Sequence, residues 1–277
     1  MAEAAPRTAG VRAALGEAAA RFGFSETPRL DAELLMAHAL GIARAALLLD
    51  MERAVPEGFW TLVARRERQE PVAYITGSRG FWTLDLAVGP GALVPRADSE
   101  TLVEAAVAHF RGREPATLLD LGTGPGTLLL ALLDEWRDAC GLGVDRSAEA
   151  LRYARGNAAA CGMERRARFV LGDWDAGLAG AFDCIVTNPP YIGLGEVLPD
   201  EVRLHEPAGA LFAGADGLDD YRRLAPAIRR LLAPGGAAFL EIGHTQAGAV
   251  TALLEGEGFA VTLHRDLAGR PRVLAAT

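Results

Sequence analysis

From Pro115 to the C-terminus, apolar strand patterns alternate with helical patterns. Strands are expected at residues 117–121, 141–145, 167–171, 182–187, 237–242, 260–264 and 273–275, and helices between them include 147–160, 221–232 and 245–256. This alternation predicts a parallel sheet with helices on both faces. The loop between the last two strands is too short for a helical crossover, so these two are expected to pair antiparallel. Residues 96–277 therefore predict an α/β domain with a doubly wound, seven-stranded sheet.

Residues 1–70 show a helical pattern instead. Leu15, Ala18 and Phe22 recur at a spacing that places them on one face of a helix. Thr27-Pro28 is typical of the N-cap and first residue of a second helix, which Gly41 would end. We expect a small helical bundle that recognises a partner and carries no chemistry of its own.

The connector between these regions, residues 71–95, has a period of two. Trp82, Leu84, Leu86 and Val88 fall on one side of an expected strand, and glycines flank it on both sides. The pattern predicts a β-hairpin.

The composition excludes several classes of protein. The net charge is -8 and the isoelectric point is about 5.2, which disfavours a protein whose affinity comes from neutralising nucleic-acid phosphates. All 28 basic residues are Arg, so the lysine of phosphate-binding loops and Schiff-base chemistry with pyridoxal phosphate are excluded. Cys140, Cys161 and Cys184 have no metal-ligand spacing and are expected to be small buried side chains in a reducing compartment.

Other absences complete the expected setting. The five histidines are scattered along the chain, so no metal site is expected. No apolar run is long enough for a membrane span, and the N-terminus does not resemble a signal peptide. The chain is expected to act in the cytoplasm, away from membranes.

A glycine-rich loop follows the first strand of the expected sheet. Gly122, Thr123, Gly124, Pro125 and Gly126 lead into a helix, where closely spaced glycines allow the main chain to approach a ligand. The dinucleotide fingerprint requires its third glycine one position later, where this chain has Thr127, so a nicotinamide cofactor is disfavoured.

The next two strands end in residues suited to a nucleoside. Asp145 ends the second strand, where a carboxylate can accept hydrogen bonds from both ribose hydroxyls, although it could also cap the following helix. Asp173-Trp174 follows the third strand and offers an acceptor and a flat apolar ring for an adenine. As an isolated pair, these two would more often be a surface Asp and a core Trp.

The fourth strand ends in Asn188-Pro189-Pro190-Tyr191. The two prolines hold the preceding residues extended and stiffen the backbone. The Asn188 side-chain oxygen and the Pro189 carbonyl are thus neighbouring acceptors, which suit the two hydrogens of a planar NH2 group. A turn that merely ends a strand is the structural alternative.

These motifs are expected to converge. In doubly wound sheets, the ligand crevice lies between the first and fourth strands, where the strand order reverses. Because adjacent strands are about 5 Å apart, the glycine loop and Asn188 should face a single ligand.

Together, the motifs resemble class I S-adenosylmethionine-dependent methyltransferases, and almost the whole chain resembles the HemK/PrmC family of bacterial release factor glutamine methyltransferases. The resemblance includes Arg29–Leu35, Glu70–Gly77, Val94-Pro95-Arg96, Glu206-Pro207 and Asp216-Gly217-Leu218. The chain departs from the family pattern at Ala97, where Pro is usual, and at Pro125, where Ser is common.

The resemblance implies a Rossmann-like class I methyltransferase fold and an activity. The expected reaction transfers a methyl group from S-adenosyl-L-methionine, leaving S-adenosyl-L-homocysteine, to the side-chain amide nitrogen (N5) of the glutamine in the Gly-Gly-Gln motif of class 1 peptide chain release factors. The chain is expected to act as a monomer, with no direct contact to nucleic acid.

The implied site has three sets of residues. Asn188, Pro189 and Tyr191 are the expected catalytic residues, and Pro190 joins them in binding the substrate. The expected cofactor-binding residues are Gly122, Thr123, Gly124, Pro125, Gly126, Asp145, Trp174 and Asn188. Catalysis is expected to rest on orientation, without a dedicated base, because an amide nitrogen is a poor nucleophile that no ordinary base deprotonates.

Three alternatives remain open. A sister enzyme that methylates a glutamine of a large-subunit ribosomal protein shares the core and the Asn-Pro-Pro-Tyr motif. An adenine-N6 DNA methyltransferase shares the motif but would need a basic surface. A non-catalytic cofactor-binding scaffold is the third.

Overall fold

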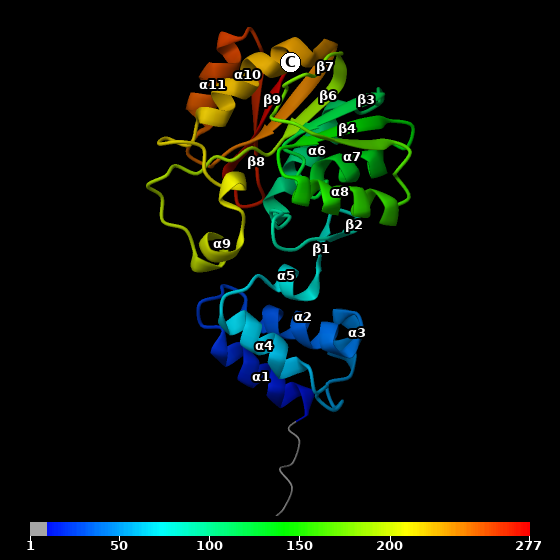
Figure 1. The fold of residues 1–277 in the computed structure, drawn as a ribbon, viewed down its shortest axis with the longest axis vertical. Coiled ribbons are helices and arrows are strands. Elements are labelled where there is room, and N and C mark those ends of the chain that lie inside the picture. Colours follow the sequence, from blue (N-terminus) through cyan, green and yellow to red (C-terminus); the bar gives the residue numbers. More distant parts are fainter. Residues whose placement is uncertain (1–9) are drawn as a thin grey trace, which may run out of the picture. The chain divides into compact units, whose positions relative to one another are not determined.

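The computed structural model describes residues 10–277, which form two compact units (Figure 1). One unit, here called the helical unit, contains the described residues up to Gly77 together with Pro199–His205. The other, here called the catalytic unit, contains Ser78–Leu198 and Glu206–Thr277. A short segment from the second half of the sequence thus belongs to the helical unit.

The helical unit consists of six helices in the described part of the chain. These are α1 (Val11–Arg21), α2 (Pro28–Leu40), α3 (Arg44–Leu49), α4 (Phe59–Glu67), α5 (Val72–Thr76) and α9 (Asp200–His205). The predicted face of the first helix is confirmed, because Leu15, Ala18 and Phe22 are fully buried. Pro28 begins α2, and Gly41 follows it with a φ of 66°. Thr27 does not cap the helix; its hydroxyl donates to Asp31 at 3.3 Å.

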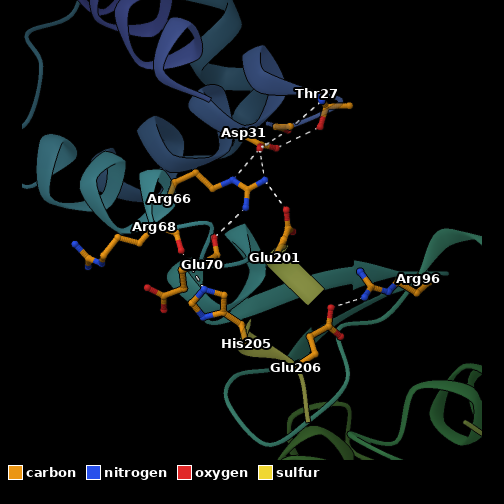
Figure 2. A network of polar contacts seen from close by, with 10 residues as sticks. Thr27, Asp31, Arg66, Arg68, Glu70, Arg96, Glu201, His205 and Glu206 are labelled. Atoms are coloured by element: carbon orange, nitrogen blue, oxygen red, sulfur yellow. Dashed lines mark hydrogen bonds and ion pairs between the residues drawn. The ribbon is translucent and has the colours of Figure 1, made fainter. Parts of the chain in front are cut away.

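A buried cation connects three segments of the helical unit (Figure 2). Arg66 of α4 is 2 % exposed and donates to the Asp31 carboxylate of α2 at 2.9 Å. It also donates to Glu201 of α9 at 2.8 Å and to the Glu70 carbonyl at 3.1 Å. The His205 ring bonds the Arg68 carbonyl at 3.1 Å. The short helix α9 is therefore held to α2 and α4 by charge and hydrogen bonds.

The connector contains a hairpin that is shorter than the sequence predicts. Strands β1 (Ser78–Phe81) and β2 (Leu84–Ala87) pair antiparallel, and α5 occupies residues 72–76 just before them. Trp82 was expected in a strand, but it lies in the turn with a φ of 56°. Its indole nitrogen donates to Glu135 at 2.7 Å, which stabilises this turn conformation. Leu86 and Val88 are buried as predicted.

The catalytic unit is built on a seven-stranded sheet in the order β5-β4-β3-β6-β7-β9-β8. Its strands are β3 (Thr117–Leu121), β4 (Cys140–Asp145), β5 (Ala167–Leu171), β6 (Phe182–Thr187), β7 (Leu232–Glu241), β8 (Val261–Arg265) and β9 (Pro271–Ala276). The first five are parallel, and β9 pairs antiparallel with both β7 and β8. The seven strands and their antiparallel last pair are therefore confirmed.

Helices cover both faces of this sheet (Figure 1). The helices of the catalytic unit are η1 (Ala97–Ser99), α6 (Glu100–His109), α7 (Thr127–Glu135), α8 (Ala148–Ala160), η2 (Ala208–Ala210), α10 (Asp219–Leu231) and α11 (Ala247–Gly256). Alternate residues of each buried strand enter opposite cores: Leu118 packs with α6 and α7, whereas Leu119 packs with α10 and α11. Because both faces are covered, ligands reach the sheet at its edges.

The cysteines differ from the expectation of three buried side chains. Cys184 on β6 is buried, Cys161 is half-buried and Cys140 is exposed at the start of β4. All three are free thiols. Within residues 10–277, no helix has the length and apolar character needed to cross a membrane.

Candidate active site

The strand register brings the motifs to one edge of the sheet. Leu121 of β3 pairs with Val144 of β4 and with Thr187 of β6. The Thr187 hydroxyl donates to the Leu121 carbonyl at 2.7 Å, which fastens the two strand ends together. The glycine loop and Asn188 therefore begin side by side, at the predicted reversal of strand order.

A cavity that is partly open to solvent lies at this edge. Of the residues predicted from the sequence, its lining includes Gly122, Thr123, Gly124, Pro125, Asp145, Trp174, Asn188 and Pro190. Gly126, Pro189 and Tyr191 do not line it. The glycine loop and the Asn-Pro-Pro-Tyr motif thus contribute to a single cavity.

The glycine loop is held from two sides. Gly122 has a φ of 75°, and a Cβ there would lie 3.0 Å from the Trp174 ring. The Pro125 carbonyl accepts a hydrogen bond from Asn157 at 2.9 Å. Gly126 begins α7 as its N-cap residue. The loop therefore presents its backbone to the cavity in a fixed conformation.

Asp145 helps to hold the glycine loop in this conformation. One of its carboxylate oxygens accepts from the Gly124 N–H at 2.8 Å, and the other accepts from the Ser147 N–H at 2.8 Å. Ser147 caps α8, because its hydroxyl accepts from the Ala150 N–H. A carboxylate has about four lone-pair sites, so each oxygen of Asp145 can still accept from a ligand hydroxyl.

Asp120 is buried in the lining of the same cavity and has one oxygen without a hydrogen-bond partner in the part of the chain that the structure describes. Its Oδ2 accepts from the Thr123 hydroxyl at 2.7 Å and from the Leu129 N–H at 3.3 Å. Its Oδ1 is buried and has no hydrogen-bond partner among the described residues. Burial raises the pKa of Asp120 to about 7. A cationic group of a ligand would satisfy Oδ1, so this side of the cavity is suited to a cation.

Trp174 lies against the glycine loop. Its side chain is 9 % exposed, and its indole N–H donates to Asp220 at 3.0 Å. Its backbone has a φ of 52°, which is uncommon for a bulky residue. The ring is thus held at the cavity wall, where a flat apolar surface could contact an aromatic group of a ligand.

Asn188 follows β6, across the reversal of strand order from the glycine loop, which follows β3. Its Nδ2 donates to the Ser99 hydroxyl oxygen at 3.3 Å, so Nδ2 is already engaged within the protein. Pro189 and Pro190 are buried, and Tyr191 is half-buried. Burial, followed by the nearby Glu241 charge, raises the pKa of Tyr191 to about 12. Tyr191 therefore stays protonated and cannot act as a base near neutral pH.

Hydrogen bonds from Gln246 hold the backbone of Tyr191. Gln246 Nε2 donates to the Tyr191 carbonyl at 2.9 Å and to the Gly217 carbonyl at 3.2 Å. Gly217 has a φ of 72°, and a Cβ at this position would lie 2.3 Å from the Tyr191 carbonyl oxygen. Only glycine fits here, which explains why Asp216-Gly217-Leu218 accompanies the Asn-Pro-Pro-Tyr motif.

We expect Gly217→Ala to lower turnover by at least about 10-fold, because the new methyl group must displace the Tyr191 backbone. Gly258→Ala is the matched control: Gly258 also has a positive φ, of 85°, but no atom lies within 4 Å of its Cβ position. The control should lose about 1 kcal/mol of stability and keep its activity. Methyl-transfer rates and thermal denaturation of both variants test this. Equal activity losses would contradict the steric explanation.

The sequence predicted only some of the residues that form the remaining wall of the cavity. Arg96 lines it and forms an ion pair with Glu206, whose side chain is fully buried. Glu206 also accepts from the Val94 N–H at 3.1 Å. The motif Val94-Pro95-Arg96 is thus tied to Glu206-Pro207. Asp120 and Ser99 were not predicted as site residues; an acidic residue ending a buried strand just before a glycine loop was the one available signal.

Two domain families match separate parts of the chain. Residues 13–77 match the PrmC N-terminal domain, and residues 97–199 match the methyltransferase small domain. Among solved structures, a methyltransferase from Pyrococcus furiosus has a TM-score of 0.53 at 18 % identity, covering 70 % of this chain and 88 % of its own. The Thermus thermophilus 16S rRNA N2 G1207 methyltransferase, solved with AdoMet and guanosine, has a TM-score of 0.50 at 24 % identity. The likeness covers 72 % of this chain and 49 % of that one, and both likenesses establish the methyltransferase fold.

Relatives with higher identity span nearly the full chain. A protein from Rhodospirillum rubrum is 49 % identical over 91 % of this chain and 79 % of its own length. One from Cereibacter sphaeroides is 43 % identical over 96 % of both chains. A third, from Caulobacter vibrioides, is 43 % identical over 90 % of this chain and 89 % of its own. All three carry the name release factor glutamine methyltransferase. With this identity spanning both units, the chain belongs to the release factor glutamine methyltransferase family.

Proposed function

We propose that the chain transfers a methyl group from S-adenosylmethionine to the side-chain amide nitrogen of the glutamine in the Gly-Gly-Gln motif of class 1 release factors. The observation that carries this proposal is that the glycine loop and Asn188 line one cavity. A methyl donor and an amide substrate can therefore meet there. The names of the relatives supply the identity of the protein substrate.

The cavity residues fit the proposed cofactor. Asp145 has lone pairs for ribose hydroxyls, Trp174 offers a flat ring for adenine, and the orphaned Asp120 oxygen suits an ammonium group. We assign the backbone of residues 122–125, which line the cavity, to the same role, while Gly126 serves as the N-cap residue of α7. When bound, S-adenosylmethionine supplies a methyl group on a sulfonium, and it leaves as S-adenosylhomocysteine.

The substrate amide is positioned by the Asn-Pro-Pro-Tyr motif. Asn188 Oδ1 and the Pro189 carbonyl accept the two amide hydrogens, which fixes the amide plane so that the nitrogen lone pair, perpendicular to that plane, faces the methyl donor. Pro190 stiffens the backbone, and Tyr191 packs against the amide. Alignment of this kind is worth up to roughly 7–11 kcal/mol.

No residue of the cavity is assigned the role of general base. Tyr191 stays protonated because of its raised pKa. The methylated nitrogen becomes acidic only after the bond to carbon has formed, and its proton then passes to water. The chain thus contributes orientation and not acid–base chemistry.

A single assay separates this function from its alternatives. The purified chain is incubated with labelled S-adenosylmethionine and with release factor, large-subunit ribosomal proteins or duplex DNA. We expect label in release factor at the Gly-Gly-Gln glutamine, located by mass spectrometry. Label in ribosomal protein alone, in DNA alone or in none of them would refute the proposal.

Asp145→Ala should weaken S-adenosylmethionine binding by about 10-fold to 100-fold, because hydrogen bonds to a charged group are lost and the glycine loop is freed. Isothermal titration calorimetry measures this. Asp138→Ala removes an exposed carboxylate from the same unit and should leave the affinity unchanged. Equal affinities for both variants would rule out the role given to Asp145.

Cofactor affinity should also depend on pH. The carboxylate form of Asp120 attracts a cation, and it is lost as the pH falls through a pKa of about 7. Affinity should therefore drop about 10-fold between about pH 7.5 and about pH 5.5, a range in which the amino group of the ligand stays protonated. Calorimetry should show Asp120→Asn to be weaker and nearly independent of pH. The same pH dependence in that variant would exclude Asp120 as its source.

We assign recognition of the release factor to the helical unit. Its PrmC N-terminal domain accompanies the catalytic unit in relatives that share this name. A whole release factor should then be methylated with a much lower KM than a short peptide containing Gly-Gly-Gln. Equal KM values would refute this assignment.

A further inference from the structure

Gln246 occupies a helix position that usually holds a different kind of residue. It is the N-cap residue of α11, where Ser, Thr, Asp and Asn are preferred because their short side chains accept from the first backbone N–H groups. The Gln246 side chain makes no such bond to its own helix. A residue that breaks a local rule in this way is expected to serve contacts elsewhere in the fold.

The contacts of the Gln246 amide use both of its hydrogens. Nε2 donates to the Tyr191 carbonyl at 2.9 Å and to the Gly217 carbonyl at 3.2 Å. Oε1 accepts from the Gly243 N–H at 3.1 Å. The reverse orientation of the amide would place Oε1 against two carbonyl oxygens. The three bonds therefore fix the orientation of the amide as well as its position.

Two glycines lie close to this amide, one on each side. A Cβ at Gly217 would lie 2.7 Å from Gln246 Nε2, and a Cβ at Gly243 would lie 2.8 Å from Gln246 Oε1. A side chain at either position would have to displace the amide. The Gln246 amide thus occupies a space that only glycine leaves open on both sides.

The Asn-Pro-Pro-Tyr motif is held at both of its ends. Before the motif, the Thr187 hydroxyl donates to the last carbonyl of β3 at 2.7 Å. At its end, Gln246 holds the Tyr191 carbonyl. The two prolines between these points have fixed φ angles, which makes the motif stiff. A shift of the Tyr191 carbonyl would therefore be passed to the acceptors that hold the substrate amide.

We propose that Gln246 is a positioning residue for methyl transfer, which holds the Asn-Pro-Pro-Tyr motif where its two acceptors meet the substrate amide. The inference rests on the proposed function for the identity of that substrate. Gln246 does not line the cofactor cavity, and it acts through the Tyr191 backbone. Its replacement should therefore change kcat and leave the affinity for S-adenosylmethionine unchanged.

Two replacements of Gln246 divide its bonds in opposite ways. Gln246→Lys keeps a donor for the Tyr191 and Gly217 carbonyls and loses the acceptor for the Gly243 N–H. Gln246→Glu keeps that acceptor, but at about pH 8 it directs a carboxylate at the two carbonyl oxygens. At the beginning of α11, the helix dipole favours Glu and disfavours Lys. Helix stability and the expected activity thus change in opposite directions.

Gln246→Glu should lower kcat about 10-fold to 100-fold at saturating substrates, the scale of a small misplacement caused by a change remote from the chemistry. Gln246→Lys should keep kcat within about fivefold of wild type, because the bond to Tyr191 is retained. Calorimetry should give the wild-type affinity for S-adenosylmethionine in both variants. Gln246 is half-buried, so both variants are expected to fold, which thermal denaturation checks.

Thr245→Glu and Thr245→Lys are the matched controls. They place the same charges at the preceding residue, which is exposed. Both should keep the wild-type kcat, because the bonds of the Gln246 amide are untouched.

Hydrogen exchange in the full chain measures the positioning without a substrate. Ile192 follows the motif, and its N–H donates to the Leu211 carbonyl at 3.0 Å. This amide should exchange about 10-fold faster in Gln246→Glu than in wild type, and at nearly the wild-type rate in Gln246→Lys.

Three results would overturn the proposal. They are a Gln246→Lys rate as low as that of Gln246→Glu, a wild-type kcat in Gln246→Glu, or an equal loss of kcat in the Thr245 variants. Failure of the proposed function is separate, because it appears as a wild-type chain that does not methylate release factor. In that case the exchange of Ile192 still tests the inference, and equal exchange in wild type and both Gln246 variants would contradict it.

Discussion

Asn188→Ala should reduce methyl transfer to release factor by at least about 10²-fold to 10³-fold, the scale of losing one preorganised hydrogen-bonding group at a reacting centre. Without Oδ1, one amide hydrogen of the substrate has no acceptor, and the nitrogen lone pair is no longer aligned. The measurement is a single-turnover rate with labelled cofactor.

The affinity of Asn188→Ala for S-adenosylmethionine is the internal control. Asp145, Asp120 and the glycine loop are untouched by this change, so calorimetry should give nearly the wild-type affinity. A parallel loss of affinity and rate would mean that Asn188 acts mainly in holding the cofactor, and the substrate role assigned to it would fall.

Arg66→Met should destabilise the helical unit by about 3–5 kcal/mol. Arg66 and Asp31 have side chains that are only 3 % and 8 % exposed. Removing the cation leaves the Asp31 carboxylate buried, with only the Ser25 and Thr27 hydroxyls as donors. Faster hydrogen exchange of the α2 amides in the full chain would report this loss.

Arg53→Met is the matched control for that experiment. Arg53 pairs with Asp50 at 3.0 Å, but their side chains are 39 % and 51 % exposed, so solvent screens this pair. Its removal should cost less than about 1 kcal/mol. If both variants exchanged at the same rate as wild type, the buried cation would contribute no net stability to the unit.

Five of the seven strands of the catalytic unit were predicted to within one residue, whereas β7 begins five residues and β9 two residues earlier than expected. Buried parallel strands are mainly apolar runs bounded by glycine or polar residues, and 117–121 and 182–187 are runs of this kind. The proximity of the first and fourth strands, β3 and β6, also followed from the glycine loop and Asn188, which were expected to face a single ligand. Local sequence therefore carried most of the information about the fold.

The sequence was less informative where tertiary contacts override local pattern. Trp82 continues a period of two, yet it turns the chain because its indole finds Glu135. On α2, the charged residues Asp31 and Glu33 are buried beside apolar neighbours, which a hydrophobic pattern does not predict. Asp31 is paired inside the unit with Arg66, which is 35 positions away in the sequence.

The residues of the candidate site also fall into two groups, those that the sequence motifs predicted and those that they did not. Residues 122–125, Asp145, Trp174 and Asn188 could be proposed from motifs, since each follows a predicted strand. Ser99 could not, because its significance lies in its hydrogen bond with Asn188, which is 89 positions away in the sequence. No spacing rule connects such distant positions.

The placement of α9 affects any attempt to exchange helical units between relatives. The polypeptide leaves the helical unit after Gly77, enters it again at Pro199, beyond the Asn-Pro-Pro-Tyr motif, and leaves it a second time after His205. A transplant carrying only the first 77 residues would leave Glu201 behind and deprive Arg66 of one of its two carboxylates. A working chimera should therefore bring residues 199–205 from the same donor as the N-terminal helices.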